Sequence, residues 1–524
     1  MTIVPKGYIN RQEEHMMRAS GVLLPISSIP SNYGIGCFSK EAYDFVDQLV
    51  EAGQSYWQIL PLGPTGYGDS PYQSFSTFAG NPYFIDLEEF IQRDLLTAAE
   101  CAGCDWGGSK SYVDYEKVYN SRFSLLRKAY RRFYQLDGKD KELQLIREEM
   151  EAFQQEQGFW LADYCLYMAV KDSLDGIAWN QWPEDLKTRK PEALAKAGEE
   201  LKEEISFYAF QQFWFYRQWS RLKKYANDRA IKIIGDLPIY VAFDGADAWA
   251  NPDLFQFDEN AVPVAVAGCP PDAFSATGQL WGNPLYNWEY HKKTDYNWWT
   301  LRMSHCMKLY DKVRIDHFRG FDEYWAVPYG DETAENGKWE KGPGIQLFKI
   351  LEKNIEGLDV IAEDLGFLTD SVRELLSESG YPGMKVLQFA FDESGESVYL
   401  PFRYDRNCIV YTGTHDNETT KGWLGNLTES GRDYVSRYTA SEGKDMDECV
   451  WGLIRAAQSS VADVCVIPLQ DYLCLGNEAR MNTPSTLGDN WKWRLTKGQL
   501  QDEVLKRIYA MTKLYGRSQE HKEK

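Results

Sequence analysis

The sequence predicts an α/β fold, a (β/α)8 or TIM barrel with inserted, mainly helical subdomains. Short apolar runs recur along the 524 residues, and longer segments with helical periodicity separate them. The runs are continuous rather than alternating, which is typical of parallel strands buried on both faces. We count eight such runs, the number of strands in this barrel.

The eight expected strands are spread along the whole chain, which we interpret as one barrel over residues 1–524. They cover residues 21–26, 56–62, 231–241, 312–318, 359–366, 384–391, 407–417 and 464–472. A helix is expected after the first strand, with Ser39 as its N-cap and Gly53 as its stop. A long amphipathic helix over 206–230 leads into the third strand.

Two connections are too long for a simple barrel. Residues 66–229, between the second and third strands, are expected to form an inserted helical subdomain. Residues 242–300 form a second insertion, which contains AGCPPDAFSATGQLWGNPLYNW. This run is rich in glycine, proline and aromatic residues and lacks a helical period, so we expect an ordered functional loop.

Composition excludes several classes of partner. A net charge of −21 disfavours nucleic acid and anionic membrane surfaces, which both require a basic footprint. There is neither an apolar run of membrane-spanning length nor a signal-peptide core, so we expect a cytoplasmic protein without a membrane partner. The ten cysteines are then expected as reduced thiols, and the spacing of Cys101 and Cys104 as a loop coincidence.

Carboxylates occupy the ends of four expected strands, where a barrel gathers its functional residues. They are Asp236, Asp316, the pair Glu363 and Asp364, and Asp416. Each one alone could be a helix N-cap. Four together, each flanked by glycine, histidine or arginine, favour a site.

Strand alternation suggests how these groups divide the chemistry. Arg314 and Asp316 share a face, so the arginine should hold Asp316 ionised, whereas His317 should point the other way and be structural. Glu363 follows an apolar run near other carboxylates and should retain its proton. One ionised and one protonated carboxyl group are what glycosidic bond cleavage requires, and Asp416 would contact sugar hydroxyls or the transition state.

A metal site is the competing interpretation of Asp316–His317, Glu363–Asp364 and His415–Asp416. Only six histidines occur, and alternation makes Asp316 and His317 a poor chelate. No glycine-rich loop with a following lysine is present for phosphate chemistry. We therefore expect neither a metal nor a cofactor.

A glycine- and tyrosine-rich stretch follows the second strand, GPTGYGDSPYQSFSTFAGNPYFIDL. It is either a packed turn or a rigid loop that presents Tyr67 and Tyr72 as flat surfaces with hydroxyl groups. Trp281, in the later loop, is a similar candidate. Sugar rings stack on such aromatic surfaces.

Several motifs together resemble one family. RIDHFRG, AEDLG, GTHDNET, YGDSPYQSFSTFAGNPY, GDLPIYV, PPDAFSATGQLWGNPLYNW and NEARMNTP are similar to those of the amylomaltases, which are 4-α-glucanotransferases of glycoside hydrolase family 77. The matches run from Leu23 to Arg494 in the family's order. RIDHFRG alone would indicate only the wider α-amylase group.

The resemblance implies a retaining enzyme that needs no metal or cofactor and transfers α-1,4-glucan segments to the 4-hydroxyl of another glucan or of glucose. It assigns Asp316 as nucleophile, Glu363 as general acid/base and Asp416 as transition-state stabiliser. The remaining implied sugar contacts are Tyr67, Ser70, Tyr72, Asp236, Asp272, Phe274, Gln279, Trp281, Asn287, Arg314, His415 and Asn482. Asp272, Phe274, Gln279 and Trp281 would belong to a lid that excludes water.

The chain departs from the family at Ala273, where members often carry an aromatic residue, so we expect weaker stacking of the lid on the acceptor. The expected partners are malto-oligosaccharides and amylose, and the chain is expected as a monomer or homodimer. A mature plastid chain would instead reside in the stroma. Two alternatives stay open: an α-amylase-type hydrolase, which uses the same carboxylates, and a non-catalytic glucan-binding protein.

Overall fold

The structure is a computed structural model that describes residues 18–66, 68–135, 141–271, 275–366, 368–392 and 395–519. Eight parallel strands form its central sheet, in the order β10-β11-β12-β1-β2-β3-β6-β9. Their bounds are β1 Ala19–Leu23, β2 Tyr56–Gln58, β3 Lys232–Leu237, β6 Lys312–Ile315, β9 Val360–Ala362, β10 Gly383–Val386, β11 Cys408–Tyr411 and β12 Val464–Pro468.

The two outer strands of this sheet meet and close the barrel. The Ala362 N–H of β9 donates to the Pro382 carbonyl, next to β10, at 3.0 Å. All eight predicted strands are present, and each is shorter than its apolar run. The predicted (β/α)8 barrel is confirmed.

Two apolar clusters lie on opposite faces of these strands. Ile234, Ile361 and Ile409 belong to the cluster inside the barrel. Their neighbours Ile233 and Val360 belong to the larger cluster beneath the helices. Burial on both faces explains why the strands are continuous apolar runs in the sequence.

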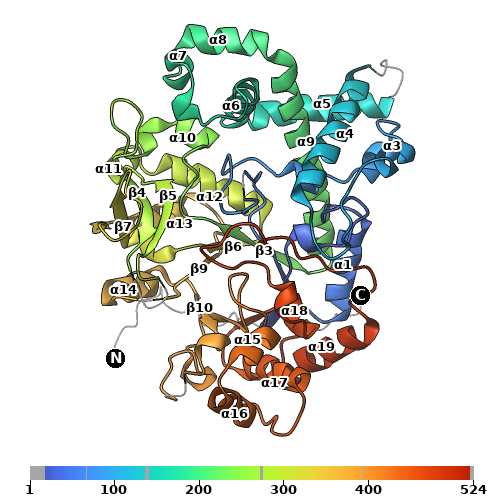
Figure 1. Cartoon of the computed structure of the whole chain (residues 1–524), viewed down its shortest axis with the longest axis vertical. Helices are drawn as coiled ribbons and strands as arrows, with labels where there is room; N and C mark the ends of the chain where they lie inside the picture. Colours follow the sequence, from blue (N-terminus) through green and yellow to red (C-terminus); the bar gives the residue numbers. More distant parts are fainter. Residues whose placement is uncertain are drawn as a thin grey trace, which may run out of the picture.

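Helices cover the outside of the barrel, and Figure 1 shows α15 to α19 grouped around the C-terminal strands. The bounds outside the first insertion are α1 Lys40–Glu51, α10 Ala246–Ala250, α11 Trp288–Lys293, α12 Asn297–Leu309, α13 Ile345–Asn354, α14 Asp370–Ser379, α15 Thr420–Asn426, α16 Glu429–Tyr438, α17 Met446–Ser459, α18 Leu469–Tyr472 and α19 Asp502–Leu514. Ser39 is the N-cap residue of α1, but its hydroxyl donates to Glu41 at 2.7 Å and caps no backbone N–H.

Helices also fill the long connection between β2 and β3. They are α2 Glu88–Gln92, α3 Ala98–Ala102, α4 Tyr115–Gln135, α5 Lys141–Glu156, α6 Leu161–Ser173, α7 Glu184–Lys187, α8 Pro191–Glu200 and α9 Lys202–Asp228. Most of them stand together at one end of the molecule, and α9 runs from this group down beside the barrel (Figure 1). α9 begins four residues before the helix predicted over 206–230.

A second sheet flanks the barrel, with the antiparallel order β5-β4-β7-β8. Its strands are β4 Ala265–Cys269, β5 Gln279–Pro284, β7 Glu323–Pro328 and β8 Lys338–Lys341. We expected residues 267–288 to form an ordered loop, which is wrong for the last three residues of β4 and for the whole of β5. Glycine and an irregular register between Val266 and Gly268 concealed the strand pattern.

Candidate active site

Strand register places two functional side chains in one layer inside the barrel. Ile234 faces inward, so Asp236 two residues later also faces inward. Asp236 lies opposite Arg314 on β6, and Arg314 lies opposite the inward-facing Ile361 on β9. The barrel interior therefore changes from apolar to charged at its C-terminal mouth.

Arg314 joins two carboxylates. Its Nη1 contacts both carboxylate oxygens of Asp236 at 2.8 Å, and its Nη2 donates to Asp316 Oδ1 at 2.9 Å. The side chains of Arg314 and Asp236 are 4% and 0% exposed, whereas Asp316 is 31% exposed. The buried pair thus fixes the guanidinium group, and Asp316 remains open to the cavity. The predicted contact between Arg314 and Asp316 is present.

Glu363 follows β9 and is held by two backbone amides. Oε2 accepts the His317 N–H at 2.8 Å, and Oε1 accepts the Leu365 N–H at 2.7 Å. Burial raises the pKa of Glu363 to about 7, against the opposing charge of Arg314 and with the repulsion of Asp316. A substantial fraction of Glu363 therefore keeps its proton at neutral pH.

Asp416 belongs to a separate ion pair. Its Oδ2 lies 3.3 Å from His415 Nε2, and its Oδ1 accepts from Asn482 Nδ2 at 2.7 Å. Burial alone would raise the pKa of Asp416, but His415 and Asn482 outweigh burial and hold this pKa well below its usual value. Burial would lower the pKa of His415, and the charge of Asp416 raises it instead. Each member of the pair therefore favours the charged form of the other.

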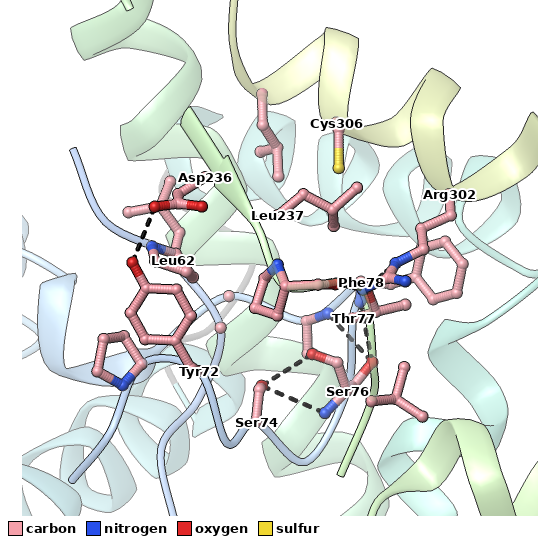
Figure 2. Close-up of a pocket in the computed structure, with 18 of the residues that line it drawn as sticks. Leu62, Tyr72, Ser74, Ser76, Thr77, Phe78, Asp236, Leu237, Arg302 and Cys306 are labelled. Carbon is pink, nitrogen blue, oxygen red and sulfur yellow. Dashed lines mark hydrogen bonds between the residues drawn. The ribbon is translucent and has the colours of Figure 1, made fainter. Parts of the chain in front are cut away.

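Tyr72 connects the two ion pairs. Its hydroxyl donates to Asp236 Oδ2 at 2.8 Å and lies 2.9 Å from His415 Nε2, with its ring stacked on the imidazole. Figure 2 shows the Tyr72 hydroxyl directed at the Asp236 carboxylate. A single polar network therefore runs from Asp316 through Arg314, Asp236 and Tyr72 to the His415 pair.

These groups line a cavity of about 470 Å³. Of the sequence-predicted residues it gathers Ser70, Tyr72, Gln279, Trp281, Arg314, Asp316, Glu363, His415, Asp416 and Asn482. Asp236 lies behind Tyr72 and Arg314. Asn287 is not in the lining; its side chain caps α11 by accepting the Tyr290 N–H. Tyr67, Asp272, Ala273 and Phe274 lie outside the described residues.

The structure corrects the predicted orientation of His317. Alternation placed it opposite Asp316, yet both residues line the cavity. Strand β6 ends at Ile315, and His317 has a left-handed φ of 52°, so the strand rule no longer applies. The His317 ring packs edge-on against Trp281 at 4.8 Å, and burial lowers its pKa to about 4. The same limit explains why His415 and Asp416, four and five residues beyond the end of β11, both face the cavity.

Sequence reasoning also missed several other lining residues. They are Gln73, Tyr240, Asn283, Phe389, Asn417 and Trp491. Tyr240 lies at the end of the third predicted strand, where functional residues of a barrel gather, so the sequence could have indicated it. In the described part of the chain, no cluster of three or more metal-ligating side chains is arranged to hold a metal ion. No described helix is long and apolar enough to cross a bilayer.

A closed parallel barrel with a carboxylate-lined sugar-sized cavity at its C-terminal mouth defines a carbohydrate-active enzyme. The family model described as 4-alpha-glucanotransferase matches residues 24–501. The chain belongs to this family.

Known relatives match over nearly their full length. The 4-alpha-glucanotransferase of Clostridium butyricum is 48% identical over 94% of this chain and 99% of its own length. That of Thermus thermophilus is 46% identical over 94% of this chain and 98% of its own length. The solved amylomaltase from Streptococcus agalactiae, in complex with acarbose, superimposes with a TM-score of 0.91 at 39% identity, covering 96% of this chain and 100% of that one.

Proposed function

We propose that the chain transfers an α-1,4-glucan segment from one malto-oligosaccharide or amylose chain to the 4-hydroxyl of another glucan or of glucose. Asp316 is the nucleophile, Glu363 the general acid/base and Asp416 the stabiliser of the oxocarbenium-like transition state. Family membership supports the transfer reaction over the hydrolytic and non-catalytic alternatives. The roles of the individual residues rest on the geometry of the cavity.

The observation that carries these roles is the contrast between Asp316 and Glu363. Asp316 is ion-paired with Arg314 and open to the cavity. Glu363 is buried, and its pKa of about 7 leaves it protonated in a large fraction of molecules. A nucleophile and an acid therefore coexist at one pH, as a retaining mechanism requires.

The reaction then proceeds in two displacements. Glu363 gives its proton to the glycosidic oxygen while the Asp316 carboxylate attacks the anomeric carbon. The bond to the leaving glucan breaks and a glycosyl ester forms on Asp316. Glu363, now ionised, takes the proton from the acceptor 4-hydroxyl, whose oxygen displaces Asp316 and restores the α-configuration.

Asp416 and His415 are suited to stabilise the transition states of the two displacements. The carboxylate is 45% exposed and remains ionised beside His415, so it can face developing positive charge on the sugar ring. Trp281 and His317 form an apolar wall next to the nucleophile. Excluding water from that wall favours a sugar acceptor over hydrolysis.

The product pattern of maltotriose tests this function. Transfer gives glucose and a ladder of longer glucans, and the number of reducing ends hardly increases. Hydrolysis gives glucose and maltose with a steady increase in reducing ends. Chromatography of one incubation, with reducing ends counted in parallel, separates these outcomes. A cytoplasmic location and a monomeric or dimeric state stay predictions from the sequence.

A further inference from the structure

A second cavity, of about 220 Å³, lies between the helical insertion and the helices that follow β3. We call it the Phe159 cavity. Its walls come from α6 with the preceding residues Phe159 and Trp160, from α10, and from α11 and α12. Cavities at such junctions between substructures are frequent ligand sites.

Aromatic rings form the floor of the Phe159 cavity. The Phe78 ring packs edge-on against Phe159 at 5.3 Å and against Trp298 at 6.3 Å, and it stacks on Trp160 at 6.2 Å. Phe159 is 46% exposed, although the rings around it are buried. An exposed aromatic surface beside a cavity is available to a ligand.

The two carboxylates that line the Phe159 cavity each have a hydrogen-bond partner. Asp163 accepts from Arg189 Nη2 at 2.6 Å, which balances its charge. Asp247 accepts the Thr77 N–H at 2.7 Å, and burial raises its pKa to about 6. Asn297 adds an exposed amide to the lining. The partnered carboxylates and the exposed amide suit a neutral ligand with hydroxyl groups better than an anion.

The size of the Phe159 cavity matches a sugar ring. An engineered apolar cavity of about 150 Å³ accommodates benzene, and this cavity of about 220 Å³ is larger and open to solvent on one side. We propose that it is a second, non-catalytic saccharide site that binds one or two rings of a malto-oligosaccharide. The ligand class rests on the proposed function, because it is the same glucan that the active site uses.

The Phe159 cavity does not coincide with the catalytic one. Its lining shares no residue with the cavity around Asp316. The segment after Tyr72 links the two cavities, because Ser76 and Phe78 form one wall of the Phe159 cavity. Figure 2 shows this segment passing from Tyr72 towards Arg302. A long glucan held at the second site would raise the local concentration of substrate near the first.

Two variants test the proposal with a matched control. Phe159→Ala removes the exposed ring, and Asn297→Ala removes the exposed amide. Phe402→Ala is the control, because Phe402 is 69% exposed and lies outside the lining of the Phe159 cavity. Amylose affinity is measured by retardation in native gels, and hydrogen exchange is measured with and without excess maltotetraose.

We expect Phe159→Ala to weaken amylose affinity about fivefold, while the maltotriose transfer rate stays within twofold of wild type. Maltotetraose should slow exchange in residues 157–164 and 294–301 of the wild type and of Phe402→Ala, but not of Phe159→Ala. The proposal is overturned if both cavity variants keep wild-type amylose affinity, or if these segments gain no protection. Failure of the wild type to rearrange maltotriose would instead overturn the proposed function, independently of these binding results.

Discussion

The catalytic cavity and the Phe159 cavity differ in how many charged groups they bury and in how those groups are paired. The catalytic cavity contains a buried arginine with two carboxylates and a charged histidine–aspartate pair. The Phe159 cavity combines six aromatic residues with two carboxylates, which are paired or accept a backbone N–H. Burying charges costs free energy that only close partners offset.

This difference separates chemistry from binding. A nucleophile and an acid must have different proton affinities, which requires buried charge and a network that fixes it. Stacking a neutral sugar requires only accessible aromatic area and a few hydrogen bonds. Substitutions at charged positions in the catalytic cavity should therefore have much larger effects than equivalent substitutions at the Phe159 cavity.

The largest effect is expected for Asp316→Asn. Removing the nucleophile should lower kcat for maltotriose transfer by about 10⁴-fold, because the glycosyl ester can no longer form. Amylose affinity should fall less than twofold, since the Phe159 cavity is unchanged. Asp370→Asn, on the exposed first turn of α14, is the control and should keep full activity. Near-normal transfer by Asp316→Asn would show that Asp316 is not the nucleophile.

The barrel strands and much of the catalytic cavity could be predicted from the sequence, because strands buried on both faces form continuous apolar runs. The runs around Ile234, Val313 and Ile361 are buried on both faces, so their continuous apolar pattern located them. The carboxylates followed from their positions at the ends of those runs. Arg314 and Asp316 were paired correctly because the strand period of two still holds at the end of β6.

Other features could not be predicted, because they lie outside the regular strand period or depend on tertiary packing. His317 was placed on the wrong face because a left-handed backbone follows β6. The strands β4 and β5 of the second sheet were missed because both contain glycine and their pairing register is irregular. The Phe159 cavity joins residues from α6, α10 and α12, which are far apart in the sequence and meet only through tertiary packing.

Arg314→Met tests the cost of buried charge. It leaves Asp236, which is 0% exposed, without its cation, so the free energy of unfolding should fall by about 3–5 kcal/mol. Arg189→Met at the Phe159 cavity breaks a partly exposed pair, with side chains 23% and 42% exposed, and should cost about 1 kcal/mol or less. Denaturant unfolding monitored by circular dichroism measures both.

A double variant sharpens this result. Asp236→Asn combined with Arg314→Met removes both charges. The loss in the free energy of unfolding of this double variant should therefore be smaller than the sum of the losses of the two single variants. Equal losses for Arg314→Met and Arg189→Met would show that the buried network carries no special stability, and the contrast between the cavities would fail.

The pH dependence of transfer should follow Glu363. Its pKa is raised to about 7, and the protonated form is the acid that begins the reaction. Activity is therefore retained below this pKa and lost as the pH rises through it. We expect kcat/KM for maltotriose to decrease about tenfold per pH unit above pH 7 or so. Circular dichroism over the same range controls for unfolding, and a profile that stays level to pH 9 would exclude Glu363 as the acid.

Tyr72→Phe should give the smallest effect of the series. The variant loses the hydroxyl that contacts Asp236 and His415, but Arg314 still holds both oxygens of Asp236, so no buried carboxylate is left unpaired. A hydrogen bond to a charged group contributes about 1.5–3 kcal/mol, which predicts a loss in kcat/KM of roughly 10- to 100-fold with little change in stability.

Tyr290→Phe is the matched control for Tyr72→Phe, because Tyr290 lines the Phe159 cavity and has no role in the proposed chemistry. It should leave kcat/KM within twofold of wild type. If both tyrosine variants behaved alike, the hydroxyl of Tyr72 would serve packing only. The network from Asp316 to His415 would then consist of two independent ion pairs, Arg314 with its carboxylates and His415 with Asp416, because Tyr72 is the residue through which the described side chains connect them.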